Sequence, residues 1–167
     1  VITNNDAKVY GGEVELTLTP TPGLTISTAA GYVHTRVEDI YNPTGAVPIL
    51  SDNRLPLAPK FSGNLRANYK FDALGGKPFV QGAMRYRTSM YRDSLNNPSA
   101  RIPSIFVADA VAGYESGDGM WSASLYVDNI FNTRRPINLF DNSSVGNSGE
   151  VVYNMPRWFG ARFSVGF

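Results

Sequence analysis

Few residues in this chain of 167 residues are of the types that support catalysis, and their spacing does not bring a site together. His34 is the only histidine, and there is no cysteine. A Ser–His–Asp hydrolase would need His34 to lie beside a serine and an acid. His34 falls at the end of a predicted strand, where an interfacial or loop-proximal polar residue is the ordinary interpretation. The absence of cysteine also excludes a disulfide framework and a cysteine-ligated metal site. We therefore predict no catalytic residue and no enzyme.

Acidic and glycine-rich positions do not predict an ion or phosphate site either. Two acidic pairs are present, Glu13 with Glu15 and Glu38 with Asp39. Calcium-binding loops need more carboxylates at a fixed spacing. Gly75 and Gly76 are typical of a turn, since no glycine-rich loop leads into a helix. We predict no metal and no cofactor. A formal net charge of +1 gives no electrostatic reason to expect nucleic acid as a partner.

Arginine and aromatic side chains carry the remaining binding chemistry. Four arginines on predicted strands could form a cationic strip that guides an anionic ligand: Arg66, Arg85, Arg87 and Arg162. The more ordinary alternative is that they pair with carboxylates on neighbouring strands or elsewhere in the protein. Aromatic and arginine residues in or beside long loops could contact a substrate, because such residues are favoured in binding sites. The candidate substrate-binding residues are Arg66, Arg85, Arg87, Tyr91, Arg92, Phe140 and Tyr153, and Tyr41 lies in another loop of this kind.

The closing stretch, residues 151–167, indicates most clearly which elements position these side chains. From residue 159 onward one parity is Phe159, Ala161, Phe163, Val165 and Phe167, and the other is Gly160, Arg162, Ser164 and Gly166. This period of two predicts a β-strand with one apolar face. A soluble protein rarely leaves so apolar a strand at its terminus. The last strand of a transmembrane β-barrel, by contrast, must pair and face lipid.

Composition agrees with a membrane wall. Charged residues make up 17% and aromatic residues 12% of the chain, against a charged fraction of about 25% in soluble domains. No apolar segment approaches the ~18 residues of a membrane helix, which excludes helical spanning only. The chain begins at Val1 without an initiator methionine or a signal peptide, so we expect a mature or truncated form.

Seven strands are predicted, joined alternately by short and long connections. The predicted strands are residues 8–19, 24–38, 60–71, 79–91, 104–115, 120–131 and 159–167. Short turns lie near Pro22, Gly75 and Gly117, and the long connections are 39–59, 92–103 and 132–154. Short periplasmic turns and longer extracellular loops are typical of outer-membrane barrels. A blurred pattern near Val33 and Val37 predicts a bulge or the end of the membrane zone.

Strand length and aromatic placement favour this barrel over the alternative, a soluble β-sandwich, which also alternates. The predicted strands are about 12 residues long, and about 9–11 residues cross a bilayer. Interfacial girdles need aromatic residues near strand ends. The sequence has such residues at Tyr32, Phe61, Tyr69, Phe71, Phe79, Tyr114, Trp121 and Trp158. We therefore predict an all-β fold, an antiparallel transmembrane β-barrel segment of about seven up-and-down strands.

Four short motifs, in order along the chain, resemble TonB-dependent outer-membrane receptors. Residues 121–132 (WSASLYVDNIFN) resemble the signature W-x-L-x-L-x-V-x-N-L-F-(D/N) of the family's penultimate strand. Residues 155–163 (MPRWFGARF) resemble its last strand, x-P-R-x-(F/Y)-G-(V/L)-x-(L/F). Residues 11–24 resemble a hairpin that begins G-x-E-x-E-(L/V), and residues 57–61 resemble the P-(K/R) start of another strand. Arg134 and Arg135 depart from the Lys/Arg-Tyr pair that family members often have there.

The resemblance implies a barrel of 22 strands in which residues 1–167 form the C-terminal segment. A plug domain, a TonB box and the earlier strands would then lie outside this chain. The resemblance also implies active import of a scarce solute, such as a ferric siderophore, across the outer membrane of a Gram-negative bacterium. A passive porin-like barrel is the alternative. The implied partners are outer-membrane lipid, the TonB complex, the barrel-assembly machinery and a small-molecule substrate.

The last strand carries two further expectations. Phe163, Val165 and Phe167 resemble the terminal aromatic signal that the barrel-assembly machinery reads, and lipid-facing packing is the simpler interpretation. Residues 159–167 should also form one edge of the sheet in this chain, paired on one side only, with residues 121–131.

Overall fold

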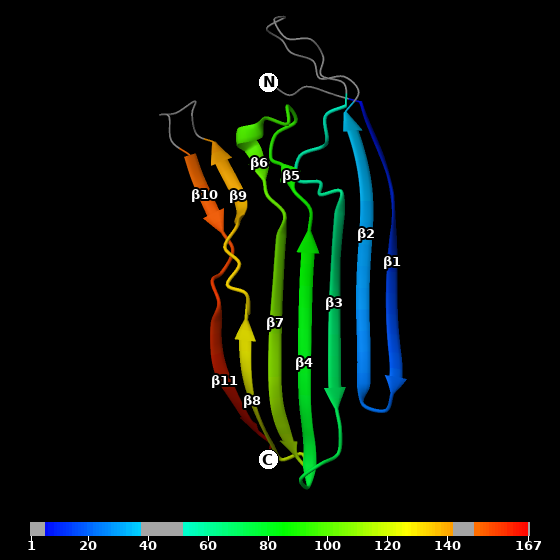
Figure 1. The fold of residues 1–167 in the computed structure, drawn as a ribbon, viewed down its shortest axis with the longest axis vertical. Coiled ribbons are helices and arrows are strands. Elements are labelled where there is room, and N and C mark those ends of the chain that lie inside the picture. Colours follow the sequence, from blue (N-terminus) through cyan, green and yellow to red (C-terminus); the bar gives the residue numbers. More distant parts are fainter. Residues whose placement is uncertain (1–5, 38–51, 142–148, 167) are drawn as a thin grey trace, which may run out of the picture.

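The computed structural model describes residues 6–37, 52–141 and 149–166. Seven long strands form one antiparallel sheet, and neighbours in the sheet follow one another along the chain (Figure 1). The strands are β1 (Ala7–Thr21), β2 (Leu24–Val37), β3 (Phe61–Lys70), β4 (Gly76–Arg87), β7 (Ile105–Ser116), β8 (Trp121–Asp128) and β11 (Trp158–Val165). The predicted all-β architecture of seven up-and-down strands is confirmed. No helix in the described ranges is long and apolar enough to cross a membrane.

Two short hairpins stand at one end of this sheet (Figure 1). One pairs β5 (Met90–Tyr91) with β6 (Arg101–Ile102), and the other pairs β9 (Pro136–Asp141) with β10 (Gly149–Tyr153). A single turn of 3-10 helix, η1 (Pro98–Ala100), precedes β6. β6, β9 and β10 fall within the predicted long connections 92–103 and 132–154, so these connections contain short strands that the sequence pattern does not predict, and β5 falls at the end of the predicted strand 79–91. The strands of both hairpins, two to six residues long, are too short to show a clear period of two.

The predicted strand 79–91 runs past the end of the observed one: residues 79–87 lie in β4, and Met90–Tyr91 form the separate strand β5. β4 ends at Arg87, because Thr88 bonds back to Phe61: the Thr88 amide donates to the Phe61 carbonyl at 2.9 Å, and the Phe61 amide donates to the Thr88 hydroxyl at 3.1 Å. The predicted bulge near Val33 and Val37 is absent, and the β1–β2 ladder runs without a shift from Ala7 to Leu18. The irregularity lies between Leu18 and Thr21, where Pro20 has no amide to give to the ladder. The predicted loop 39–59 lies largely outside the described residues.

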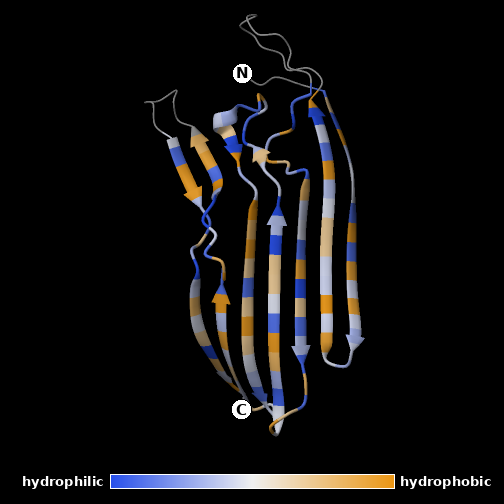
Figure 2. Ribbon diagram, viewed as in Figure 1, coloured by the Kyte–Doolittle hydropathy of each residue, from blue (hydrophilic) through white to orange (hydrophobic). Residues whose placement is uncertain are grey.

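In each long strand the more apolar residues occupy alternate positions. The register of the ladders brings these residues to one face of the sheet. One row runs across the sheet as Ile26, Ala67, Gly82, Ala110, Val127 and Phe159. The opposite parity carries charged and polar side chains, among them Asn64, Arg85 and Asp109. We call these the apolar face and the polar face. Figure 2 shows the resulting alternation of hydrophobic and hydrophilic residues along the strands. Asp109 therefore lies on the polar face, as its charge predicts.

Aromatic rings on the apolar face form two belts. We call the end of the sheet that carries the two short hairpins the outer end and the opposite end the inner end. The outer belt contains the ring pairs Phe61–Tyr86 (centroids 6.2 Å apart) and Phe106–Phe131 (5.9 Å). The inner belt contains Tyr69–Phe71 (5.1 Å), Tyr114–Trp121 (5.4 Å) and Trp121–Phe163 (6.3 Å). The ten residue steps from Phe61 to Phe71 span about 33 Å along a strand. A tilt of about 40° projects this length to about 25 Å, the height of the apolar band of a transmembrane β-barrel.

Two aromatic residues predicted for these girdles lie on the polar face instead. Phe79 pairs opposite Gly113, and a Cβ built on Gly113 would lie 2.5 Å from the Phe79 ring. Trp158 packs edge-on against Tyr126, with centroids 5.4 Å apart. The prediction for Phe79 and Trp158 is therefore wrong, because each falls one residue out of step with the apolar parity of its strand. The Phe79 ring can occupy the space beside Gly113 because glycine has no side chain there.

The sheet has two edges and very little buried core. β11 pairs with β8 alone, so the predicted edge is confirmed for the described part of residues 159–167. Only four hydrophobic residues in the described ranges are buried, Val37, Met90, Ile102 and Ala108. A soluble sandwich would cover the apolar face with a second sheet. No such layer covers it in the part of the chain that the structure describes, and Leu125 on this face is 68% exposed.

Candidate functional site

The polar face carries the predicted arginines, and a groove of about 610 Å³ lies over it between β1 and β4. Arg85 reaches across to the next strand, where its Nη2 lies 2.8 Å from Oδ2 of Asp109. Arg87 donates to the carbonyl oxygen of Pro103 at 3.0 Å. Arg85 thus pairs with a carboxylate on the neighbouring strand, whereas the partner of Arg87 is a backbone carbonyl in the segment before β7. In the described ranges the side chains of Arg66 and Arg162 form no ion pair or hydrogen bond.

A second cluster lies at the outer end of the sheet, where three arginines stack on aromatic rings. The guanidinium carbon of Arg92 lies 4.5 Å from the centroid of the Phe140 ring. Arg54 lies 4.9 Å from the ring of Tyr91, and Arg134 lies 5.3 Å from the ring of Tyr153. A guanidinium over an aromatic face is held by the ring quadrupole and keeps its N–H edge free for an anionic oxygen. The Nη1 of Arg54 already donates to the Ser89 carbonyl at 3.3 Å, so the Arg92 and Arg134 pairs are the ones that can present a preoriented cation.

The Arg92–Phe140 pair lines an outer groove of about 380 Å³ between the η1 loop and the β9–β10 hairpin. Its other lining residues include Asn97, Ser99, Leu139, Glu150 and Val151. Asp93, also on the groove, is held by Asn97, whose side-chain amide donates to Oδ2 of Asp93 at 2.6 Å. The groove thus combines one oriented cation, the carboxylates of Asp93 and Glu150, apolar walls and neutral polar groups, a lining suited to a small ligand of mixed polarity.

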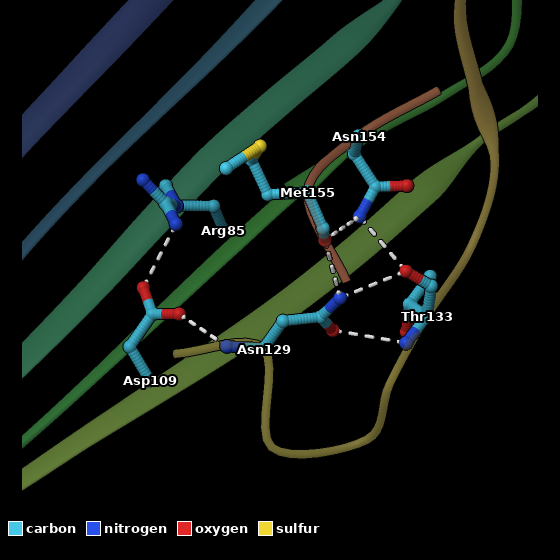
Figure 3. A network of polar contacts seen from close by, with 6 residues as sticks. All are labelled: Arg85, Asp109, Asn129, Thr133, Asn154 and Met155. Carbon is cyan, nitrogen blue, oxygen red and sulfur yellow. Dashed lines mark hydrogen bonds and ion pairs between the residues drawn. The ribbon is translucent and has the colours of Figure 1, made fainter. Parts of the chain in front are cut away.

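A network of polar contacts, which we call the polar joint, lies where this hairpin leaves the wall. Figure 3 shows its six residues, Arg85, Asp109, Asn129, Thr133, Asn154 and Met155. The Asn129 side-chain amide donates to the carbonyl oxygens of Thr133 (2.8 Å) and Met155 (2.9 Å), and its Oδ1 accepts from the Thr133 amide (2.9 Å). Asn129 is only 3% exposed and has a positive φ of 54°. Three of the four hydrogen bonds that its side chain can form are therefore used to fasten two crossing segments.

The turn between β7 and β8, at the opposite end of the sheet, is held by an acid. The Ser116 hydroxyl donates to Oδ1 of Asp118 at 2.5 Å, and the Met120 amide donates to the same oxygen at 3.0 Å. These bonds keep the pKa of Asp118 below its usual range. The carboxylate thus helps to close the turn that the sequence predicts at Gly117.

The structure brings some predicted site residues together and separates others. Arg92 and Phe140 share the outer groove, with Tyr91 and Tyr153 engaged in the other stacked pairs nearby. Arg66, Arg85 and Arg87 lie on the polar face of the wall. Phe163 and Val165 lie exposed on the apolar face of β11, and Phe167 and Tyr41 lie outside the described residues. No cluster of three or more histidine, aspartate or glutamate side chains that could hold a metal occurs in the described ranges.

The contacts of Arg54 and Arg134 and the role of Asn129 are not predicted from the sequence. The partners of Arg54 and Arg134 lie 37 and 19 residues away along the chain, too far for a local pattern. Asn129 stands within the VDNIF segment that carries the family resemblance. Asn96 and Asn132 also have positive φ values, and asparagine adopts this conformation more readily than most residues.

Solved structures with the same fold are bacterial receptors. The ferric yersiniabactin uptake receptor FyuA from Yersinia pestis aligns with a TM-score of 0.79 and 22% identity over 98% of this chain and 24% of that receptor. The siderophore receptor PiuA from Acinetobacter baumannii aligns with a TM-score of 0.75 and 20% identity over 95% of this chain and 22% of that receptor. The ferripyoverdine receptor of the outer membrane of Pseudomonas aeruginosa aligns with a TM-score of 0.67 and 21% identity over 95% of this chain and 19% of that receptor. The chain thus spans about a quarter or less of these receptors' length.

A family model described as "TonB dependent receptor-like, beta-barrel" matches residues 1–130. The match covers more than half of the chain and includes six of the seven strands of the sheet. The aromatic belts, the polar face opposite them and the short turns at one end are features that a transmembrane wall requires. The chain therefore belongs to the TonB-dependent receptor-like β-barrel family, whose members are outer-membrane transport receptors.

Proposed function

We propose that this chain forms wall and outer loops of a Gram-negative outer-membrane receptor that imports a ferric siderophore with energy from TonB. Its family membership and the siderophore receptors among the similar structures support this function. The observation that carries it is the outer groove, where the Phe140 ring orients the Arg92 guanidinium at 4.5 Å. Ferric siderophores present anionic oxygens around the metal, and a ring-stacked guanidinium binds such oxygens through its N–H edge. Transport leaves the covalent bonds of the substrate unchanged.

The proposal extends to the whole receptor. Residues 1–167 are the C-terminal segment of a barrel of about 22 strands, and the plug and TonB box lie outside this chain. The small share of the similar receptors that the chain covers supports this arrangement. TonB engages the region outside this chain. The barrel-assembly machinery recognises the terminal strand, where Phe163 and Val165 lie on the apolar face.

Uptake of radioactive iron by whole cells tests the function. The full-length receptor is expressed in cells that lack their own siderophore receptors, and ferric catecholate, hydroxamate and carboxylate chelates are supplied in turn. We expect saturable uptake of one chelate, lost in a strain without TonB while surface binding remains. Uptake that does not require TonB would favour a passive pore, and no binding of any chelate would overturn the siderophore assignment.

Two substitutions test the outer groove. Arg92→Ala should weaken chelate binding about tenfold or more, because a charge-assisted contact contributes about 1.5–3 kcal/mol. Arg101→Ala is the matched control: Arg101 is an exposed arginine of the same loop whose Nη2 donates to the Ser89 hydroxyl at 3.1 Å, and it does not line the groove. Equal affinities for the two variants would show that the groove is not the binding site.

A further inference from the structure

The β9–β10 hairpin joins the wall only through two segments that cross, residues 129–135 and 154–157 (Figure 1). Neither segment belongs to a sheet, and one backbone hydrogen bond joins them, from the Asn154 amide to the Arg135 carbonyl at 3.2 Å. Asparagine side chains supply most of the other bonds between them. Besides the three bonds of Asn129, the Asn154 side-chain amide donates to the carbonyl oxygens of Thr133 (2.8 Å) and Met155 (3.0 Å), and its Oδ1 accepts from the Arg135 amide (2.8 Å).

The polar joint is fixed to the wall at two points. The backbone amide of Asn129 donates to Oδ1 of Asp109 at 2.9 Å, and the Ile130 amide donates to the Ala108 carbonyl at 2.8 Å. Asp109 is held in turn by Arg85 on the neighbouring strand. The wall therefore fixes the backbone of Asn129 and Ile130, while the Asn129 side chain fixes both segments that lead to the hairpin.

We propose that Asn129 is the positioning residue of the outer hairpin: its buried side chain sets where β9 and β10 stand relative to the wall. The hairpin supplies Leu139, Phe140 and Val151 to the outer groove, so the same side chain sets the width of that groove. An alternative tether is the stacking of Phe140 under Arg92, with the packing of β9 beside β6. Removing the Asn129 side chain and removing the Arg92 side chain therefore distinguish the two tethers, because only the loss of the true one should move the hairpin.

Two substitutions at Asn129 separate its side chain from its backbone. Asn129→Gly keeps the positive φ and removes all three side-chain bonds. Asn129→Asp keeps the shape and replaces the amide donor by an acceptor that faces two carbonyl oxygens. Asn96→Gly is the matched control, because Asn96 has nearly the same φ of 55° and also bonds backbone groups with its side chain, but in a different loop.

Distances between spin labels measure the hairpin position directly. The chain has no cysteine, so labels are placed at Asp72→Cys in an inner turn and Glu150→Cys on β10, in the full-length receptor with its other cysteines replaced. We expect both Asn129 variants to displace or broaden the distance distribution, and Asn96→Gly and Arg92→Ala to leave it unchanged. A reference pair at Asp72 and Lys60, both beside β3, should not move in any variant.

An unchanged distribution in Asn129→Gly, or a change in Arg92→Ala alone, would overturn the proposal. If the Asn129 variants do not form a barrel, Asn154→Ala decides: it cuts three bonds of the joint at a half-buried site, and the proposal requires the distribution to broaden. The distance needs no ligand, so a failure here leaves the proposed uptake standing, and a receptor that imports no chelate leaves this test intact.

Discussion

Asp109 accepts a hydrogen bond from the backbone amide of Asn129, 20 residues further along the chain, at 2.9 Å. Its second carboxylate oxygen accepts from Arg85. One carboxylate thus joins β4, β7 and the segment that leaves β8. The bond to Asn129 is the costlier of the two to lose, since it satisfies an amide of a residue that is only 3% exposed.

We predict that Asp109→Ala destabilises the barrel by about 1–3 kcal/mol, the usual effect of leaving a buried amide unsatisfied. Asp109→Asn keeps an acceptor for that amide and loses only the ion pair with Arg85, whose side chain is 65% exposed. An exposed ion pair contributes about 1 kcal/mol or less. Urea unfolding of the full-length receptor in lipid vesicles measures both. Equal losses for the two variants would contradict this division.

The glycine beneath the Phe79 ring gives a second prediction. A Cβ at Gly113 would lie 2.5 Å from that ring and 2.6 Å from the Ala123 carbonyl oxygen, and the carbonyl cannot easily move. Gly113→Ala should therefore cost about 1–3 kcal/mol of unfolding free energy.

Gly82→Ala serves as the control for Gly113→Ala. No atom lies within 4 Å of a Cβ at Gly82, so this variant should stay within about 0.5 kcal/mol of the parent. Both variants are compared by the same urea titration, and a loss at Gly82 as large as that at Gly113 would refute the steric explanation.

The apolar face gives a third prediction. Met84 lies in the row of Leu65 and Ala108, midway between the aromatic belts. Met84→Arg should destabilise the barrel by about 2–4 kcal/mol, the cost of an arginine that faces lipid at mid-bilayer depth. Ala83→Arg places the same charge one residue away on the polar face, beside Asp109, and should cost about 1 kcal/mol or less. Unfolding in vesicles that yields the reverse order would assign the two faces the other way round.

The turn at Asp118 predicts a dependence on acid. Hydrogen bonds from Ser116 and Met120 lower the pKa of Asp118. A lowered pKa stabilises the fold above the unfolded value of about 3.9, and this stability is lost as pH falls through the folded value. The Met120 amide should therefore exchange its hydrogen faster as pH drops from about 5 to below about 3, after correction for the intrinsic exchange rate. Asp118→Asn should lack this added acid sensitivity. Identical pH profiles of Met120 exchange in the two proteins would show that the carboxylate does not hold the turn.

The wall could be predicted from the sequence because its determinants are local. A strand exposes alternate residues on opposite faces, so the parities of Phe61, Val80 and Phe159 predict one shared face, and the register confirms it. The errors at Phe79 and Trp158 come from using position near a strand end without parity. The short turns were equally predictable, since glycine and proline mark them in a window of a few residues.

The outer end could not be predicted in the same way. Arg92 meets Phe140 across 48 residues, and Asn129 meets Met155 across 26. Nothing in a single sequence specifies which of several arginines finds a given ring. Arg92 and Phe140 are both candidates from the sequence because arginine and aromatic residues suit binding sites. Their contact depends on the relative position of the β5–β6 and β9–β10 hairpins.

The strand order of the sheet has a consequence for how the wall is made. Each long strand pairs only with the long strands next to it along the chain, two for the inner strands and one for β1 and β11 at the edges. No strand inserts between two that come earlier in the chain. The entropic cost of closing each connection is therefore offset one hairpin at a time. No segment has to pass between strands that are already paired. Such a sheet can lengthen sideways by successive addition, with the most recent strand always offering the next set of free backbone groups. Assembly speed should then depend on the slowest single hairpin and not on a concerted search by the whole chain.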